Sequence, residues 1–193
     1  MKKLAQVGVL ALMAGLAVAT ARAEDHGISL ASLKGSYGAK SSGFTTICAN
    51  AGGCSAASPI LLQKNFVATA QATVDDDGNF CGPATASDAP VAGSAAAANI
   101  LTKNIVANVT SFDPATGQGD LNFSVYSGGS CNGASFDNAG ATLLSTGTSH
   151  IVVSEGGNRI DSVVTSYVSV SGFIGSVVNS TTLHRQRRGE EHQ

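Results

Sequence analysis

The feature that most constrains the fold is an alternation of apolar and polar residues that ends at a tight-turn sequence. Between positions 66 and 74, one face of an extended chain carries only apolar residues, namely Phe66, Ala68, Ala70, Ala72 and Val74. A period of two is typical of a half-buried β-strand. The segment 75–79 that follows contains an Asp-Gly step, which favours a tight reversal. We therefore predict a hairpin whose second strand begins at Phe80.

The second half of the chain repeats this pattern. Apolar residues alternate over 105–109 and over 121–125, and the segment 113–117 between them has a turn composition. We predict further strands over 143–153, 160–171 and 173–184, with a turn at 155–158. Three valines of the 160–171 strand are expected to point inward: Val164, Val168 and Val170. The segment 91–101 fits a brief helix and a loop equally well, and 127–140 is interpreted as a loop.

Strands joined by hairpin-length connections predict an all-β fold. A single antiparallel β-barrel is the preferred architecture, and a β-sandwich is the alternative. The domain is expected to span residues 24–184, a length that suits one hydrophobic core.

The N-terminal segment 1–23 has the three parts of a secretory signal peptide. A basic start at Lys2-Lys3 precedes an apolar run over 4–19, and Ala21-Arg22-Ala23 is a small-residue cleavage site. The run is rich in Ala and Gly and is shorter than a membrane-spanning helix requires. We expect cleavage after Ala23, a periplasmic or extracellular location, and no integral membrane insertion after cleavage.

The charge distribution excludes a nucleic-acid partner. Loss of the signal segment removes three basic residues and no acid, so the formal net charge changes from −2 to −5. The one basic cluster, Arg185, Arg187 and Arg188, lies beside Glu190 and Glu191. Nucleic-acid binding needs a basic surface, which this chain does not supply. We interpret 185–193 as a solvated, disordered tail.

Four cysteines fall in the exported part of the chain: Cys48, Cys54, Cys81 and Cys131. An even number in an oxidising compartment predicts two disulfides. Three pairings can be drawn and the sequence does not choose among them, although the short spacing of Cys48 and Cys54 suits a local bridge. That pairing would leave Cys81 with Cys131. Because there is no C-x-x-C pair and no nearby histidine, we predict no metal site at these cysteines.

Several short motifs resemble those of small exported bacterial proteins with a calycin-like barrel, of the lipocalin or allene-oxide-cyclase type. They are Gly35-Ser36-Tyr37, Asp77-Gly78-Asn79-Phe80 with Gly82, the 113–119 turn with 121–125, Gly156-Gly157-Asn158, and Arg185-Gln186. The resemblance implies a closed barrel with a ligand-binding interior. It carries over no catalytic residue and no cofactor.

Two groups of residues invite a chemical interpretation. The acidic run 75–77 suggests a calcium ligand set, but an EF-hand alignment would put Thr73 and Ala84 at ligand positions. We therefore predict a solvated hairpin tip. His150 lies in a predicted strand, with Asp161 expected on the neighbouring strand. A polar-face histidine is the simpler interpretation, and the pair of Arg159 and Asp161 is interpreted as a surface charge arrangement.

Three functions follow from these features. The first is a non-catalytic module that binds a small apolar ligand, since Ala68, Ala70 and Ala72 would leave room inside a barrel. The second is a structural or adhesive surface subunit that self-associates through an edge strand such as 173–183. A hydrolase or isomerase built on His150 ranks last. We predict no catalytic residue and no cofactor, and the sequence does not identify the ligand-binding residues.

Overall fold

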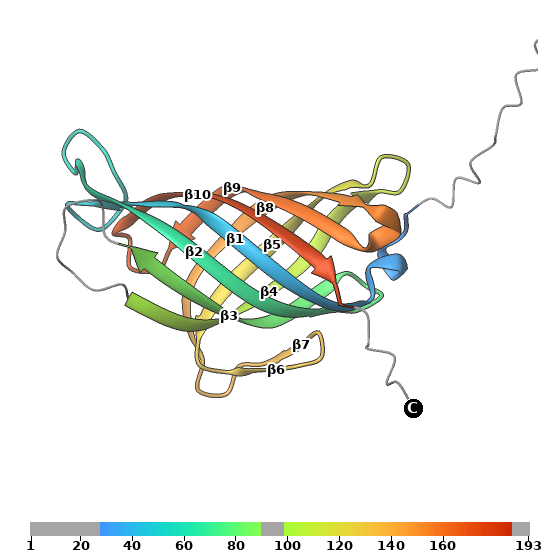
Figure 1. Cartoon of the computed structure of the whole chain (residues 1–193). Coiled ribbons are helices and arrows are strands. Elements are labelled where there is room, and N and C mark those ends of the chain that lie inside the picture. Colours follow the sequence, from blue (N-terminus) through green and yellow to red (C-terminus); the bar gives the residue numbers. More distant parts are fainter. Residues whose placement is uncertain (1–27, 90–98, 187–193) are drawn as a thin grey trace, which may run out of the picture.

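The chain forms a closed antiparallel β-barrel in the computed structural model, which describes residues 28–89 and 99–186 (Figure 1). The predicted all-β class and the barrel architecture are therefore confirmed, and the sandwich alternative is excluded. The predicted signal peptide, the segment 90–98 and the tail beyond 186 lie outside the described residues. The last three residues of the segment 91–101, predicted as a helix or a loop, belong to a strand that begins at Asn99. No helix in the described ranges is long and apolar enough to cross a membrane.

Eight long strands make up the barrel. They are β1 (Gly35–Cys48), β2 (Ile60–Val74), β3 (Asn79–Ala89), β4 (Asn99–Asp113), β5 (Gln118–Ser127), β8 (Thr142–Ser154), β9 (Arg159–Ser169) and β10 (Ile174–Arg185). Each pairs with its neighbour in the chain, and β10 pairs with β1 to close the barrel. The smaller elements are a separate hairpin of β6 (Ser130–Asn132) and β7 (Ser135–Asp137), and the 3₁₀ turns η1 (Leu30–Leu33) and η2 (Glu155–Gly157).

The predicted alternation is present in β2 from Phe66 to Ala72, and only Thr73 departs from it because it is partly buried. Phe66 and the three alanines of its face are half-buried, and Val74 is fully buried, whereas Val67, Thr69 and Gln71 are exposed. The Asp-Gly turn connects β2 to β3 as expected. The strand is longer than the predicted span 66–74. It begins at Ile60, so Lys64 is part of it.

The predicted inward face of β9 is wrong beyond Val164. Thr148 pairs with Ser166 while Ser149 pairs with Val164, so Thr165 is an extra residue at a β-bulge. One extra residue moves every later side chain to the opposite face. Val168 is consequently 61% exposed, whereas Val170 lies beyond the end of β9 and is 65% exposed but still lines the barrel interior.

Two disulfides form, Cys48–Cys54 and Cys81–Cys131, which is the pairing that the local spacing favoured. The second bridge attaches the β6–β7 hairpin to β3 (Figure 1). The segment predicted as a loop therefore contains a short hairpin. Two disulfides and no free cysteine in the described residues indicate an oxidising, extracytoplasmic environment.

One end of the barrel is packed and covered by η1 and η2 (Figure 1); we call it the closed end. Its core includes the fully buried Leu33, Tyr37, Ile151 and Ile160. Apolar side chains from five other positions complete it: Val74, Phe80, Leu121, Val153 and Leu183.

Tyr37 connects the parts of the closed end through its hydroxyl group. The hydroxyl lies 2.8 Å from the Leu33 carbonyl oxygen and 2.6 Å from that of Gly157, so both acceptors are within reach of its proton. Its oxygen accepts a hydrogen bond from Nη2 of Arg185 at 2.8 Å, and the guanidinium lies 5.4 Å from the ring centre. Arg185, which we expected to begin a solvated tail, is thus a structural residue at the end of β10.

Candidate ligand-binding cavity

The barrel interior beyond the closed end is hollow. It contains a cavity of about 680 Å³ that is lined by residues from all eight barrel strands. This volume lies within the range of sites that hold small molecules. A smaller compartment of about 160 Å³ adjoins it and shares Ala39, Phe66 and Ala70 with it.

The cavity exists because most inward positions near the middle of the barrel carry small side chains. Small lining residues come from six strands: Ala39, Ala70, Ala72, Gly82, Ala86, Ala107, Ser145, Ser149, Ser162 and Ser169. Two of the three alanines expected to leave room, Ala70 and Ala72, line the main cavity, and Ala68 lines the smaller compartment. A β-carbon at Gly147 would lie 2.5 Å from Cζ of Phe123, so this glycine makes space for the aromatic ring.

The wall is mainly apolar, with single polar side chains scattered over it and one hydrogen-bonded polar patch. Its larger apolar members include Phe66, Ile105, Phe123, Val125, Leu143, Val164 and Val177, and the scattered polar ones include Thr45, Gln71, Thr142, Ser149 and Ser162. The patch is formed by Ser41, Asn179 and Thr181, which bond to one another: Asn179 Oδ1 accepts from Ser41 Oγ at 2.8 Å and from Thr181 Oγ1 at 3.0 Å. The two hydroxyls and the amide oxygen of this patch are therefore bonded to one another, and the apolar side chains around them favour apolar matter.

Tyr167 is the largest side chain that combines a polar group with the cavity wall. Burial raises the pKa of its phenol, and a hydrogen bond with Ser145 opposes that shift. Its ring lies 6.5 Å from that of Phe123, centre to centre. Tyr167 is therefore a neutral, anchored part of the wall at physiological pH.

Two lysines line the same cavity, Lys64 on β2 and Lys103 on β4. Both side chains are half-buried. Each lies four positions after the first residue of its strand, Ile60 or Asn99, so both are placed towards the end of the barrel opposite the closed end. Sequence reasoning missed them, although the strand period places Lys64 on the face of Phe66 and Lys103 on the face of Ile105.

The cavity reaches a stretch in which two neighbouring barrel strands are not hydrogen-bonded. The described pairing of β9 with β10 covers only 159–163 with 180–184. The remaining parts, 164–169 and 174–179, both contribute residues to the cavity wall. The barrel is therefore less tightly bonded around the cavity than at the closed end.

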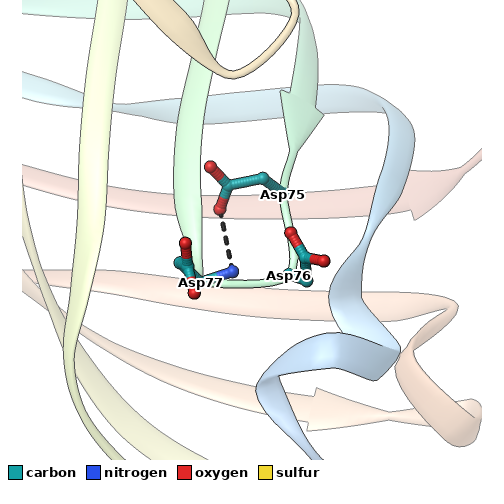
Figure 2. Close-up of side chains that lie close together, drawn as sticks. All are labelled: Asp75, Asp76 and Asp77. Carbon is teal, nitrogen blue, oxygen red and sulfur yellow. Dashed lines mark hydrogen bonds between the residues drawn. The ribbon is translucent and has the colours of Figure 1, made fainter.

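The acidic run at the β2–β3 turn is a turn structure, as predicted. Figure 2 shows Asp75, Asp76 and Asp77 around the turn, with Asp75 accepting a hydrogen bond from the Asp77 amide at 3.0 Å. Asp75 also accepts from the backbone and side-chain amides of Asn79 at 2.8 and 2.9 Å. The hydrogen bond from the Asn79 side chain is the main reason that the pKa of Asp75 is lowered. This carboxylate is committed to the turn, and Asp76 pairs with Lys34 at 3.3 Å.

His150 lies on the outer face of the barrel, away from the cavity. Its Nδ1 is 3.0 Å from Oδ1 of Asp120, and the two side chains are 44% and 58% exposed. The expectation that Asp161 would pair with His150 is wrong, because the β8–β9 register places Asp161 opposite Val152. Asp161 instead accepts from Arg159 at 3.1 Å and from Thr182 Oγ1 at 2.8 Å.

The His150 arrangement differs from that of a base that activates a serine. Ser111 Oγ donates to Asp120 Oδ2 at 2.9 Å, so the nearby hydroxyl is bonded to the carboxylate and not to the imidazole. A nucleophile–base pair requires the hydroxyl to meet the base. The hydrogen bond from His150 is the main cause that lowers the pKa of Asp120.

Comparison of the chain with protein-family models, with curated proteins and with solved structures finds no match.

Proposed function

We propose that this protein is an exported, non-catalytic binding protein with a calycin-like barrel that holds a small, mainly apolar ligand. The observation that carries the proposal is the contrast inside one closed barrel, packed at Tyr37 and hollow beyond it. Protein interiors are normally filled to the density of organic crystals. An apolar cavity of this size is what a ligand site requires.

The lining suits a ligand that buries apolar surface and makes few directed hydrogen bonds. Transfer of apolar surface out of water stabilises the complex by roughly 25 cal/mol per Å². The wall offers aromatic and aliphatic side chains from opposite strands, such as Phe66 on β2 and Leu143 on β8, while the two hydroxyls and the amide oxygen of the polar patch are already bonded to one another. Shape and apolarity would therefore select the ligand.

The test is native mass spectrometry of unreduced protein from its exporting host, followed by a binding comparison of two variants. We expect a monomer that carries a reproducible small-molecule adduct. Ala70→Phe places a ring in the cavity and should remove the adduct. Val67→Phe is the matched control, since Val67 lies on the outer face of the same strand and is 61% exposed. An adduct retained by Ala70→Phe would contradict the proposal.

A structural or adhesive subunit is the second candidate, and one feature favours it. Four exposed apolar residues gather on or next to the unpaired parts of β9 and β10: Val168, Val170, Phe173 and Val178. Strand edges with exposed apolar side chains can pair with another chain. The C-terminal half of β10 is bonded on both sides, so only 174–179 offers a free edge.

Light scattering over a range of concentrations tests this second candidate. A subunit that associates through this edge should form oligomers that Val178→Lys disperses. The matched control is Val152→Lys, at an exposed valine on β8. A monomer at all concentrations would exclude the association.

A further inference from the structure

The turn that joins β9 to β10, residues 170–173, is hydrogen-bonded to the loop that follows β1. This loop, residues 48–54, is closed by a disulfide between its first and last residues, and we call it the disulfide loop. The backbone amides of Gly52 and Gly53 both donate to the carbonyl oxygen of Gly172, each at 2.9 Å. Both segments lie at the end of the barrel opposite η1 and η2 (Figure 1). The turn is therefore held by a loop that a disulfide closes.

The bridge itself packs against the beginning of β10. The backbone amide of Cys48 donates to the carbonyl oxygen of Phe173 at 2.8 Å, directly before the strand. Gly175 is the extra residue at a bulge in the β1–β10 pairing, and a β-carbon there would lie 2.6 Å from Sγ of Cys48 and closer still to Sγ of Cys54. A glycine at this position leaves room for the bridge. The disulfide loop and the first residues of β10 therefore pack as one unit.

The residues held in this way border a seam in the cavity wall. The seam consists of two facing stretches of the described chain, 164–169 of β9 and 174–179 of β10, that are not paired with each other. Each stretch is bonded on its other side, to β8 and to β1 respectively. At the end of the seam, Val170, Ser171 and Ile174 line the cavity. Widening the seam would break no pairing between these stretches, so the disulfide loop controls how firmly this end is held.

The two disulfides differ in their access to solvent. Cys54 is exposed, whereas its partner Cys48 is 1% exposed. In the other bridge, Cys81 is 1% exposed and Cys131 is half-buried. Thiol–disulfide exchange requires a thiolate to reach one sulfur of the bridge. A soluble dithiol should therefore reduce the bridge of the disulfide loop before the other bridge, by attack at Cys54.

We infer that the Cys48–Cys54 bridge is a redox latch on the seam, and that the ligand enters and leaves the cavity there when the bridge is reduced. This inference rests on the proposed function and adds a route and its control. One thiolate of a dithiol attacks Sγ of Cys54, the bond to Cys48 breaks, and Cys48 leaves as a thiolate that takes up a proton. The second thiolate of the dithiol then attacks the mixed disulfide and releases Cys54. The dithiol gives up two electrons and becomes a disulfide.

The experiment measures how fast N-phenyl-1-naphthylamine, an uncharged fluorescent probe of apolar cavities, leaves the loaded protein after dilution in a stopped-flow instrument. We expect the dissociation rate to rise about tenfold or more when dithiothreitol reduces the disulfide loop, because three backbone hydrogen bonds and the packing of the bridge no longer oppose opening. The association rate should rise with it, so the affinity changes little. Alkylation followed by mass spectrometry shows which bridge is reduced.

Variants assign the effect to the latch. Cys48→Ser with Cys54→Ser should release the probe at the fast rate without reductant, and dithiothreitol should not change that rate. Gly175→Ala keeps both cysteines and displaces the bridge from β10, so it should release the probe faster while oxidised. Gly38→Ala on β1 is the matched control, because the nearest atom to a β-carbon there would be the side-chain amide nitrogen of Gln186, at 3.2 Å.

Hydrogen exchange of the ligand-free protein gives a second measurement, which does not depend on the probe. Reduction should raise exchange in peptides that cover the β9–β10 turn and the disulfide loop, while the closed end stays protected. Loss of protection at the closed end as well would show that reduction unfolds the barrel, and the latch would be wrong.

The outcomes separate the two proposals. If none of the oxidised, reduced and variant proteins binds the probe, the proposed function fails and the latch fails with it. If the probe binds and leaves at the same rate whether the bridge is intact or broken, the cavity is a ligand site and the latch is wrong. The latch is also wrong if the double serine variant still responds to dithiothreitol, because the other bridge would then be responsible.

Discussion

The closed end and the cavity are built from the same eight strands and differ in what points inward. At the closed end, Tyr37, Ile151 and Ile160 fill the interior completely. A few positions further along the same strands, alanine and serine take their places and the interior is hollow. Strand closure therefore does not determine whether a barrel interior is filled. The sizes of the alternate side chains determine it.

The closed end is also more extensively hydrogen-bonded than the half of the barrel around the cavity. The closed end has β9 paired with β10 and the Tyr37–Arg185 contact that joins β1, β10 and both 3₁₀ turns. Around the cavity, β9 and β10 lose their pairing. We expect the closed end to contribute more to the stability of the fold than the cavity half does.

The largest expected effect is at Tyr37. Tyr37→Ala removes a fully buried ring and the partner of Arg185, so it should lower the free energy of unfolding by about 4–5 kcal/mol. Phe66→Ala, in the cavity wall, should cost about 1 kcal/mol because the ring is half-exposed already. Equilibrium urea unfolding measures both. Equal losses of unfolding free energy in the two variants would contradict the distinction between the closed end and the cavity half.

The two disulfides come next in size. Cys81–Cys131 closes 50 residues of chain and Cys48–Cys54 closes six. In the chain-entropy model, replacing each pair by serine should cost about 4 and about 2 kcal/mol, respectively. The midpoints of urea unfolding for the two double variants give this order. A larger loss for the Cys48–Cys54 pair would show that the loop it closes is essential to the barrel.

Acid should loosen the closed end before the cavity half. The carboxylates with lowered pKa values lie in closed-end turns (Asp75, Asp113) or on the strand segments beside them (Asp120, Asp161). A carboxyl group with a lowered folded-state pKa contributes stability above its unfolded pKa of about 3.9, and that contribution is lost as pH falls through the folded value.

Hydrogen exchange measured by mass spectrometry between pH 5 and pH 3 tests this order, after correction for the intrinsic exchange rate. Peptides from the β2–β3 and β4–β5 turns should lose protection first. Asp75→Asn should flatten the acid dependence at its own turn, because the amide oxygen can still accept from the backbone amides of Asp77 and Asn79 and the amide does not titrate. Earlier loss in the cavity half would contradict the comparison.

The smallest effect is expected at the surface pair of Lys34 and Asp76. Both side chains are more than half exposed and their charged atoms are 3.3 Å apart. Exposed pairs contribute about 0.2–1 kcal/mol. Asp76→Asn should therefore change the urea midpoint slightly and lose even that difference in high salt. A larger change would show that this contact holds η1 against the closed end.

The sequence by itself determined the local structure. The alternation from Phe66 to Val74, the Asp-Gly turn and the turn at 113–117 predicted strands and hairpins that the structure contains, and the even number of cysteines predicted two bridges. These features could be predicted because the period of a strand and the backbone demands of a turn are set by neighbouring residues.

Only the tertiary structure decided which side chains meet. The bulge at Thr165 moved Val168 outward, the register gave His150 the partner Asp120, and the end of β10 brought Arg185 to Tyr37. Closure of the barrel also turned Lys64 and Lys103 towards one cavity. Residues up to 148 positions apart make these contacts, and a one-residue shift in register would change each of them. Local patterns do not encode that register, because the packing of the whole barrel sets it.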